Sequence, residues 1–426
     1  MIYREQSKDV LLNELKSAKE LYESIQAEKL SIDISRGKPC VEQLELSMPL
    51  LSIIKSNEDL PTTGADIRNY GGLEGLAGMR KLFADILEIK PEQVIAGDNS
   101  SLNMMYDTVQ RCMQFGVLGH TPWGKLDKVK FLCPSPGYDR HFTVTAVFGI
   151  ELITVPMNEN GPIMDIVESL VASDDSIKGM WCVPKYSNPT GVTYSDEVVD
   201  RLASMKCAAP DFRLFWDNAY VVHDLYDTST PLKNIYDACV EAGNPNRPFM
   251  FTSTSKITLP GAGVACFASS VENINDALKT MKFQTIGPNK INQYAHLKFL
   301  KDIDGVRAHM KKHADIIRPK FETIINVLED EFGGSDIARW SKPLGGYFIS
   351  YDVLNGCAKK VYELCKNAGL VITTVGDTFP YGRDDNDSNI RIAPTFTNTS
   401  ELDKACQILV VSTKIACIEK ILSEMN

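Results

Sequence analysis

One lysine stands where its side chain could form a Schiff base. Lys256 follows an apolar run at 249–251 and a group of small hydroxyl residues, and a turn rich in Gly and Pro separates it from a second apolar run at 264–268. Partial burial lowers the pKa of a lysine, so that the free amine can attack a carbonyl. Ser253 and Ser255 could hold a phosphate beside it. A lysine after a strand can equally be a solvated loop residue, so the rest of the chain must decide.

Other polar side chains follow other strand-like runs. Asp217 ends an apolar run, and a buried carboxylate there calls for a partner such as a cationic ring nitrogen. Tyr220 and Asn188 could donate to a phenolate oxygen on the same ring, and Tyr138 could lie on the ring face. Because active sites in parallel sheets lie at the carboxyl ends of the strands, we expect these residues to meet.

A third group suits a phosphate. Asn99, Ser100 and Ser101 stand between a short strand, 93–97, and a helix, 102–115. Such a junction presents free N–H groups and the positive end of a helix dipole to an anion. It also suits an ordinary helix N-cap. Pyridoxal 5′-phosphate (PLP) has an aldehyde, a ring nitrogen, a phenolate and a phosphate, and therefore matches all of these residues together.

The elements that must position these residues alternate along the chain. Alternation of strands and helices indicates an α/β fold with a mainly parallel sheet and helices on both faces. The strands expected in this part are 130–133, 150–155, 179–183, 213–216, 249–253 and 263–268, and helices are expected at 77–87, 142–147, 163–171 and 196–206.

The remainder of the chain predicts a second, smaller α/β domain. Residues 291–329 read as a long helix or a helix pair leading out of the large domain, and residues 10–27 read as an amphipathic helix. Strands are expected at 346–351, 370–374 and 390–393, with helices at 358–368 and 401–423. We therefore predict an N-terminal segment, 1–60, that joins the small domain, a large domain, 61–315, and a small C-terminal domain, 316–426.

Four motifs occur in an order that resembles a known family. They are NPTG from Asn188, DNAY from Asp217, STSK from Ser253 and NIRIA from Asn389. Together they resemble the fold-type I PLP-dependent aminotransferases of the class I aspartate aminotransferase superfamily. SRGKP from Ser35, PGYDRHF from Pro136 and STSKIT from Ser253 are most similar to its MocR-like branch, the subgroup Ic aspartate aminotransferases. The resemblance extends from about Ile32 to the C-terminus.

The resemblance implies a role for each of these residues. Lys256 would bind the cofactor aldehyde and then move the proton, Asp217 would keep the ring nitrogen protonated, and Arg391 would bind the substrate α-carboxylate. The family works as a homodimer with shared active sites. The other implied contacts are Asn188 and Tyr220 to O3′, Tyr138 on the ring, Ser100, Ser101, Ser253 and Ser255 to the phosphate, Tyr70 to the phosphate from the second subunit, and Gly37 on a segment that closes over substrate.

The chain departs from the family pattern in its cations. Members usually have a phosphate-binding arginine shortly after the lysine, whereas residues 261–264 hold none. The glycines there could let backbone N–H groups approach the phosphate instead, or a more distant cation could serve. For a distal substrate carboxylate the candidates are Arg36, Arg140 and Lys282, and Arg36 could also be a surface charge. The resemblance places Lys282 near where the family has an arginine from the neighbouring subunit.

Composition restricts the partners. A net charge of −10 argues against nucleic acid, and no apolar run is long enough to span a membrane. Eleven scattered cysteines without a CxxC pair favour a reducing, cytoplasmic compartment. His309 and His313 are four apart, but lysines surround them and no HExxH motif is present, so no metal is expected.

Three functions fit the sequence. The one we expect is PLP-dependent transamination of aspartate or glutamate with 2-oxoglutarate, by a ping-pong mechanism. One alternative is an aminotransferase or β-lyase for another amino acid on the same scaffold, because a fold does not fix a reaction. The other is a MocR-type regulator lacking its DNA-binding domain, which the acidic composition disfavours.

Overall fold

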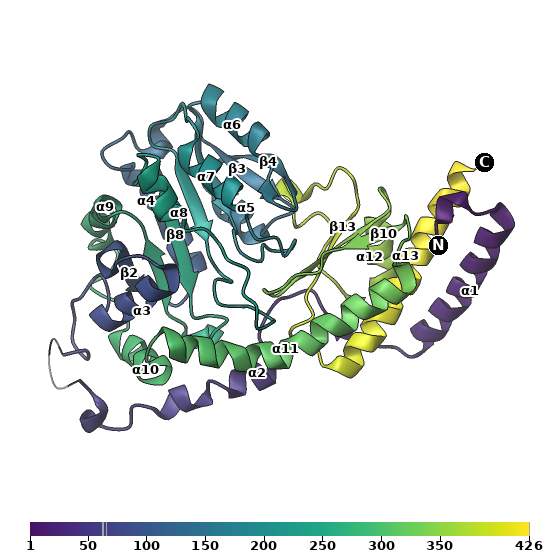
Figure 1. Cartoon of the computed structure of the whole chain (residues 1–426), viewed down its shortest axis with the longest axis horizontal. Helices are drawn as coiled ribbons and strands as arrows, with labels where there is room; N and C mark the ends of the chain where they lie inside the picture. The colour runs from purple at the N-terminus through teal and green to yellow at the C-terminus, as the bar shows by residue number, and fades with distance from the viewer. Residues whose placement is uncertain (62–63, 65, 426) are drawn as a thin grey trace.

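A computed structural model describes residues 1–61, 64 and 66–425 of the 426-residue chain. Two bodies form around two sheets, and the helix α11 (Ile303–Phe332) runs from one body to the other (Figure 1). The predicted boundary at residues 60/61 adjoins positions 62, 63 and 65, which lie outside the described residues, as does position 426 at the predicted end of the small domain.

The larger body is built on an eight-stranded mixed sheet. Its five central strands run parallel in the order β8-β7-β6-β3-β4, while β9 is antiparallel to both β2 and β8, and β5 is antiparallel to β4. The strands are β2 (Val94–Gly97), β3 (Lys130–Ser135), β4 (Glu151–Asn158), β5 (Gly161–Pro162), β6 (Ile177–Cys182), β7 (Arg213–Asp217), β8 (Pro248–Ser253) and β9 (Ala265–Ala268).

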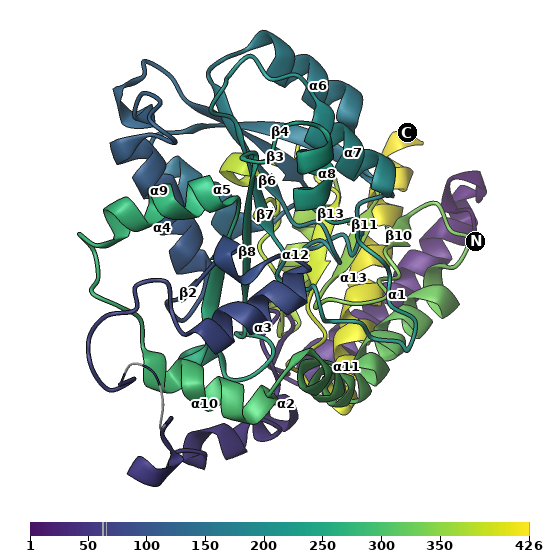
Figure 2. The ribbon, with the colours of Figure 1, turned by 60° about the vertical axis from the view of Figure 1, so that its left-hand side comes forward.

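Helices cover both faces of this sheet (Figure 2). Successive strand residues point to opposite faces, so Trp216 of β7 joins one buried cluster and Phe215 joins the other. The first cluster includes α3 (Ala77–Leu87), α6 (Met164–Ser173), α7 (Asp196–Ser204) and α8 (Ile235–Glu241), and the second includes α4 (Ser101–Phe115), α5 (Asp139–Ala146) and α9 (Val271–Met281). Asp217, one residue beyond Trp216, therefore lies at the strand end on the Phe215 face.

The smaller body packs helices against a three-stranded antiparallel sheet. Its strands, in the order β10-β11-β13, are β10 (Ala338–Trp340), β11 (Ile349–Val353) and β13 (Asn389–Ile392). The helices α1 (Lys8–Ala27), α12 (Ala358–Asn367) and α13 (Thr399–Glu424) share its core with α11, so that both ends of the chain lie in this body (Figure 1).

The N-terminal segment joins the two bodies. Its strand β1 (Ile32–Asp33) pairs in parallel with β12 (Leu370–Val371) of the smaller body. Beyond it, α2 (Val41–Glu45) lies beside α11 (Figure 1). The remaining helix is α10 (Lys290–Leu300), and the short 3₁₀ helices are η1 (Tyr3–Glu5), η2 (Met48–Ser52), η3 (Asn57–Asp59), η4 (Pro91–Gln93), η5 (Trp123–Lys125), η6 (Pro260–Ala262) and η7 (Pro380–Gly382).

The predicted α/β class and the large sheet with helices on both faces are confirmed, although three strand pairs are antiparallel where a mainly parallel sheet was expected. The segment 291–329 proves to be a helix pair, α10 and α11. The expected strand 370–374 is shorter in the structure, where Leu370–Val371 pairs with β1, and β10, α2, α8 and α9 were not predicted. Among the described residues, no helix has the length and apolar character that crossing a membrane requires.

Candidate active site

A cavity of about 470 Å³ lies at the carboxyl ends of β3, β6, β7 and β8 and extends to the smaller body. Lys256, Asp217 and Arg391 all line it, although they come from distant parts of the sequence. The other predicted residues along its wall are Arg36, Gly37, Ser101, Tyr138, Arg140, Asn188 and Tyr220. The strand ends therefore bring together most of the residues that the sequence singled out.

Asp217 is buried and has one free oxygen. Its Oδ2 lies 2.9 Å from Nε2 of His141, whereas its Oδ1 is shielded from solvent and has no hydrogen-bond partner. The ring of His141 in turn stacks on Trp181, with centroids 4.3 Å apart. A buried carboxylate oxygen without a donor is costly, so the site fits a protonated ring nitrogen that would donate to Oδ1.

Lys256 follows β8 and reaches into an aromatic corner. Its Nζ lies 5.2 Å from the ring centroid of Tyr220 and 5.9 Å from that of Tyr347. Burial lowers the pKa of this amine, while the charge of Asp217 acts in the opposite direction. The lowered pKa increases the fraction of free amine, which is the form that attacks an aldehyde.

Three hydrogen-bonding side chains surround the space between Lys256 and Asp217. Burial raises the pKa of Tyr220 well above its usual range, with further contributions from Tyr138 and Asp217, so its hydroxyl stays protonated and can donate. Tyr138 packs edge-on against His141, with ring centroids 4.9 Å apart. Asn188 is buried on the same wall. These positions suit a planar ring that carries a phenolate oxygen.

The hydroxyl groups predicted to hold a phosphate lie at the start of α4 and in the loop after β8. Ser100 is the N-cap of α4 and accepts from the backbone N–H of Asn103 at 3.3 Å, so here the ordinary capping role is realised. The hydroxyl of Ser253 donates to that of Ser255 at 3.0 Å, and Ser255 donates to the backbone carbonyl of Asn99 at 3.5 Å.

Gly263 closes the gap between these two segments. A Cβ added to it would lie 2.6 Å from the carbonyl oxygen of Asn99 and 3.3 Å from Oγ of Ser255. Only glycine fits there without a shift of these atoms, and the replacement of the missing arginine by backbone N–H groups stays a prediction.

Arg391 is held on several sides. Its Nε donates to Oγ1 of Thr373 at 3.2 Å, and its Nη1 donates to Oδ1 of Asp139 at 3.0 Å and to Oδ1 of Asn188 at 3.4 Å. The guanidinium lies 5.0 Å above the ring of Phe348. A planar guanidinium fixed in this way suits a carboxylate, and in this structure Asp139 supplies one.

Two of the three remaining predicted cations line the cavity, and the third does not. Arg36 and Arg140 line the cavity beside Arg391, and Nε of Arg140 lies 3.7 Å from Oδ2 of Asp139. Lys282 caps the C-terminus of α9, where its Nζ lies 5.3 Å from the ring of Phe283, and it is not part of the cavity wall.

Gly37 lines the cavity of its own chain, whereas Tyr70 does not. A Cβ on Gly37 would lie 2.4 Å from Cζ of Phe348, so the segment passes directly over the ring that supports Arg391. Tyr70 is 82% exposed and lies outside the cavity of its own chain.

Two site residues, His141 and Asp139, were not predicted. His141 lies three residues after Tyr138 at the start of α5, a spacing that places both on one side of a helical turn. The contact of Asp139 with Arg391 joins residues 252 positions apart, and no local pattern signals it.

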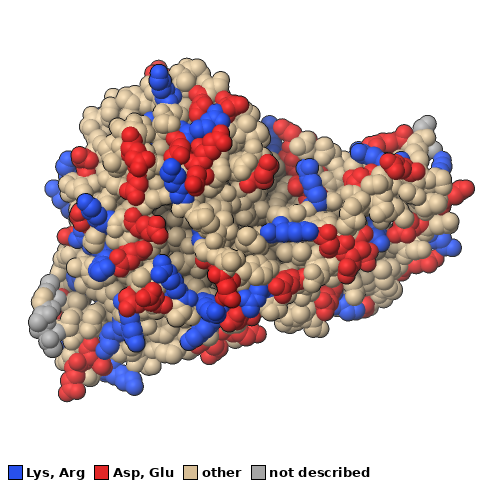
Figure 3. Space-filling model, viewed as in Figure 1, with Lys and Arg blue, Asp and Glu red and all other residues tan. Residues whose placement is uncertain are grey.

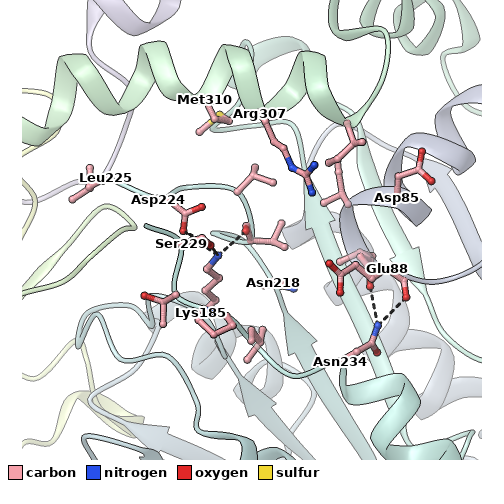
Figure 4. Close-up of a pocket in the computed structure, with 18 of the residues that line it drawn as sticks. Asp85, Glu88, Lys185, Asn218, Asp224, Leu225, Ser229, Asn234, Arg307 and Met310 are labelled. Carbon is pink, nitrogen blue, oxygen red and sulfur yellow. Dashed lines mark hydrogen bonds and ion pairs between the residues drawn. The ribbon is translucent and has the colours of Figure 1, made fainter. Parts of the chain in front are cut away.

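A second cavity, of about 500 Å³, lies over the opposite face of the sheet, against Trp216 and Met250 (Figure 4). It also contains a lysine, Lys185, but the Nζ of this residue lies 3.1 Å from each of three oxygens, in Asp224, Ser229 and the backbone of Val221. Fully engaged in this way, Lys185 is poorly placed to react, and the candidate site remains the one around Lys256.

The fold and this arrangement of lysine, aspartate and arginine define a class of enzyme, the aminotransferases. The chain belongs to the aspartate amino-transferase family, whose family model matches residues 6–425.

Relatives agree with this assignment. A protein of Mycolicibacterium smegmatis described as an aminotransferase is 47% identical over 427 residues, covering 100% of both chains. An aspartate aminotransferase of Corynebacterium glutamicum is 45% identical over 402 residues, covering 94% of this chain and 93% of the other. The crystal structure of an aspartate transaminase from C. glutamicum superimposes with a TM-score of 0.96 at 43% identity and covers 99% of each chain.

Proposed function

We propose that this aminotransferase binds PLP in the Lys256 cavity. Lys256 would hold the aldehyde carbon and Asp217 the ring nitrogen, with His141 fixing the orientation of Asp217. Tyr220 and Asn188 would donate to the phenolate oxygen. The bound cofactor supplies an electron sink that stabilises the negative charge formed when an amino acid loses its α-proton.

The phosphate would lie where α4 begins. Ser101 lines the cavity there, and Ser100, Asn99, Ser253 and Ser255 surround it. The free N–H groups of the helix N-terminus favour a dianion at this position. Tyr138 would pack against the cofactor ring.

We further propose that the amino donor is a dicarboxylic amino acid, aspartate or glutamate, with 2-oxoglutarate as acceptor in a ping-pong reaction. The observation that carries this proposal is the presence of Arg36 and Arg140 in the same cavity as Arg391. With Arg391 bound to the α-carboxylate, either Arg36 or Arg140 can bind the distal carboxylate. The name of the C. glutamicum relative supports the same donor.

A homodimer with shared sites is also part of the proposal. Tyr70 would reach the cofactor phosphate of the partner subunit, since it is exposed and does not line the Lys256 cavity of its own chain. Leu51 and Ile291, both exposed, line a cavity of about 690 Å³ that includes Asn99. Exposed apolar side chains around one cavity are typical of a subunit interface.

The location, the domain boundaries and the MocR-like subgroup remain proposals. All eleven cysteines are free thiols, which supports a reducing, cytoplasmic compartment. Basic and acidic side chains are intermixed on the face shown in Figure 3, which supports small-molecule partners rather than nucleic acid. We retain the predicted division into 1–60, 61–315 and 316–426.

A donor screen tests the substrate. The PLP-loaded protein is mixed with single amino acids, and the loss of the cofactor's visible band is followed in a single turnover. We expect aspartate and glutamate to react much faster than alanine or leucine. Arg36→Gln and Arg140→Gln are expected to slow aspartate more than alanine, with Arg339→Gln, an exposed arginine outside the cavity, as the control. A faster reaction with an apolar donor would overturn the dicarboxylate proposal and leave the family unchanged.

A further inference from the structure

The peptide that follows Lys256 is anchored to α11. The backbone carbonyl of Ile257 lies 2.8 Å from Nε2 of His309, and Nε2 of His313 lies 3.1 Å from the same His309 nitrogen. Both histidines are buried, at 7% and 1% exposure. The position of the Lys256 backbone thus depends on a contact with a helix that spans both bodies.

Gln43, on α2, completes this contact. It is 0% exposed, and its Oε1 accepts from the backbone N–H of Cys40 at 3.2 Å. Its Nε2 lies 2.9 Å from Nδ1 of His313 and donates to the hydroxyl of Tyr347 at 3.0 Å. Both the oxygen and the nitrogen of the Gln43 side chain therefore have hydrogen-bond partners, and the side chain is shielded from solvent.

The protonation of this group follows from its partners. Because the amide nitrogen of Gln43 can only donate, Nδ1 of His313 accepts, and a neutral His313 carries its proton on Nε2. This N–H donates toward the Ile257 carbonyl and toward Nε2 of His309, which then accepts. Burial lowers the pKa of His313 to about 3, and the charge of His309 adds to the effect. The histidine pair is thus neutral at physiological pH and can act as a fixed set of hydrogen bonds.

Tyr347 carries this network to the reacting groups. Its ring stacks on Tyr220 with centroids 5.9 Å apart, and Nζ of Lys256 lies 5.9 Å from its centroid. The next residue, Phe348, lies beneath Arg391 and against Gly37. One amide is therefore linked to the backbone after the reactive lysine and, through Tyr347, to the neighbour of Phe348, the residue beneath the carboxylate-binding arginine.

We propose that Gln43 is a positioning residue for Lys256, acting through Tyr347 on one side and through His313 and the carbonyl of Ile257 on the other. The inference rests on the proposed function, since it assigns Lys256 as the reactive amine. Without the two donated hydrogen bonds, the ring beside the amine and the backbone behind it lose a shared support, and the amine spends less time in its reactive position.

Gln43→Leu tests this role against a matched control. Gln93 is also a buried glutamine, 3% exposed, that accepts from the backbone N–H three residues before it, but it contacts no residue of the site. Gln43→Leu is expected to lower kcat at least tenfold with a smaller change in KM for the amino donor. Gln93→Leu, with a comparable loss of thermal stability, is expected to keep kcat within twofold.

A second measurement needs neither amino donor nor turnover. In the cofactor-free protein, the Lys256 amine reacts with pyridoxal, and borohydride reduction followed by mass spectrometry gives the rate. We expect this rate to fall at least fivefold in Gln43→Leu and to stay unchanged in Gln93→Leu. If wild-type protein does not transaminate aspartate, the proposed function fails in its substrate, whereas the comparison of amine reactivity still decides the role of Gln43.

The proposal is overturned if folded Gln43→Leu keeps both kcat and the amine reaction rate within twofold of wild type, or if Gln93→Leu reproduces the loss. Should Gln43→Leu not fold, Tyr347→Phe decides, since it removes a single oxygen from the network. An amine reaction rate at least threefold slower in that variant supports the positioning role, and an unchanged rate refutes it.

Discussion

Asp139 binds the guanidinium that we propose for the substrate α-carboxylate, and this leads to a prediction opposite to the usual effect of an active-site mutation. Any amino acid that binds Arg391 through its α-carboxylate must compete with the Asp139 carboxylate, whose Oδ1 lies 3.0 Å from Nη1. Asp139→Asn removes the competing charge while keeping an oxygen that can accept. We therefore expect the substitution to lower the KM for amino donors.

The size of the effect follows from the burial of the pair. Charge centres about 4 Å apart attract by about 4 kcal/mol at an effective dielectric constant of about 20. The Asp139 side chain is 29% exposed and that of Arg391 is 9% exposed. Exposed pairs contribute only about 0.2–1 kcal/mol, so a partly screened pair should contribute about 1.4 kcal/mol, which corresponds to a tenfold change in KM.

The assay is the single-turnover reaction of the PLP-loaded protein with aspartate and with alanine. Because both donors present the same α-carboxylate, KM should fall about tenfold for both. Asp174→Asn is the control, since Asp174 pairs with Lys130 at 2.6 Å with similar exposure but lies outside the cavity. A KM that rises or stays within twofold in Asp139→Asn would show that Asp139 holds Arg391 in place and does not compete with substrate.

Three further changes test the site and its surroundings. Lys256→Ala should abolish the visible cofactor band and reduce turnover at least a thousandfold, as measured by absorbance and a coupled assay, because no other lysine lines the cavity in the described part of the chain. Gly37→Ala should raise KM roughly tenfold with thermal stability little changed, because the new methyl displaces Phe348 from beneath the substrate arginine. His313 has a pKa of about 3 in the folded protein, below its ordinary value near 6.5, so the unfolded chain binds more protons between these pH values. The free energy of unfolding therefore falls as pH falls through this range, by up to about 1.4 kcal/mol per pH unit. His313→Gln should make the free energy of unfolding, measured with urea, depend less on pH there, and an unchanged slope would contradict the lowered pKa of His313.

Much of the site could be predicted from the order of apolar runs and polar residues along the chain. Asp217, Tyr138 and Lys256 each follow an apolar run, and parallel strands bring such positions to one edge of the sheet. The parts of the fold that the sequence did not predict depend on long-range contacts. The pairing of β12 with β1 joins residues far apart in sequence. The antiparallel pairing of β9 with β2 also joins distant segments, and apolar periodicity does not encode which strands pair.

The residues that sequence reasoning missed act through partners and not through motifs. His141 has meaning only because its Nε2 reaches Asp217, and Gln43 only because three distant segments meet around it. A histidine or glutamine with no motif is most often an ordinary surface or capping residue, so spacing alone could not select either one. Lys282 was a candidate by position in the chain, and it ends α9 outside the Lys256 cavity of its own chain, so its contribution to the site of a neighbouring subunit stays a prediction.

The short pairing of β1 with β12 determines which segments would move together if the smaller body rotated. The backbone N–H of Ile34 donates to the carbonyl of Val371, and that of Ala393 donates to the carbonyl of Ile34, so the stretch ahead of Gly37 is bound to the strand that carries Arg391. A rotation of the smaller body toward the larger one would therefore deliver the cover and the anion-binding arginine in a single motion. Solvent would leave the reaction chamber at the moment of capture, with no separate lid required.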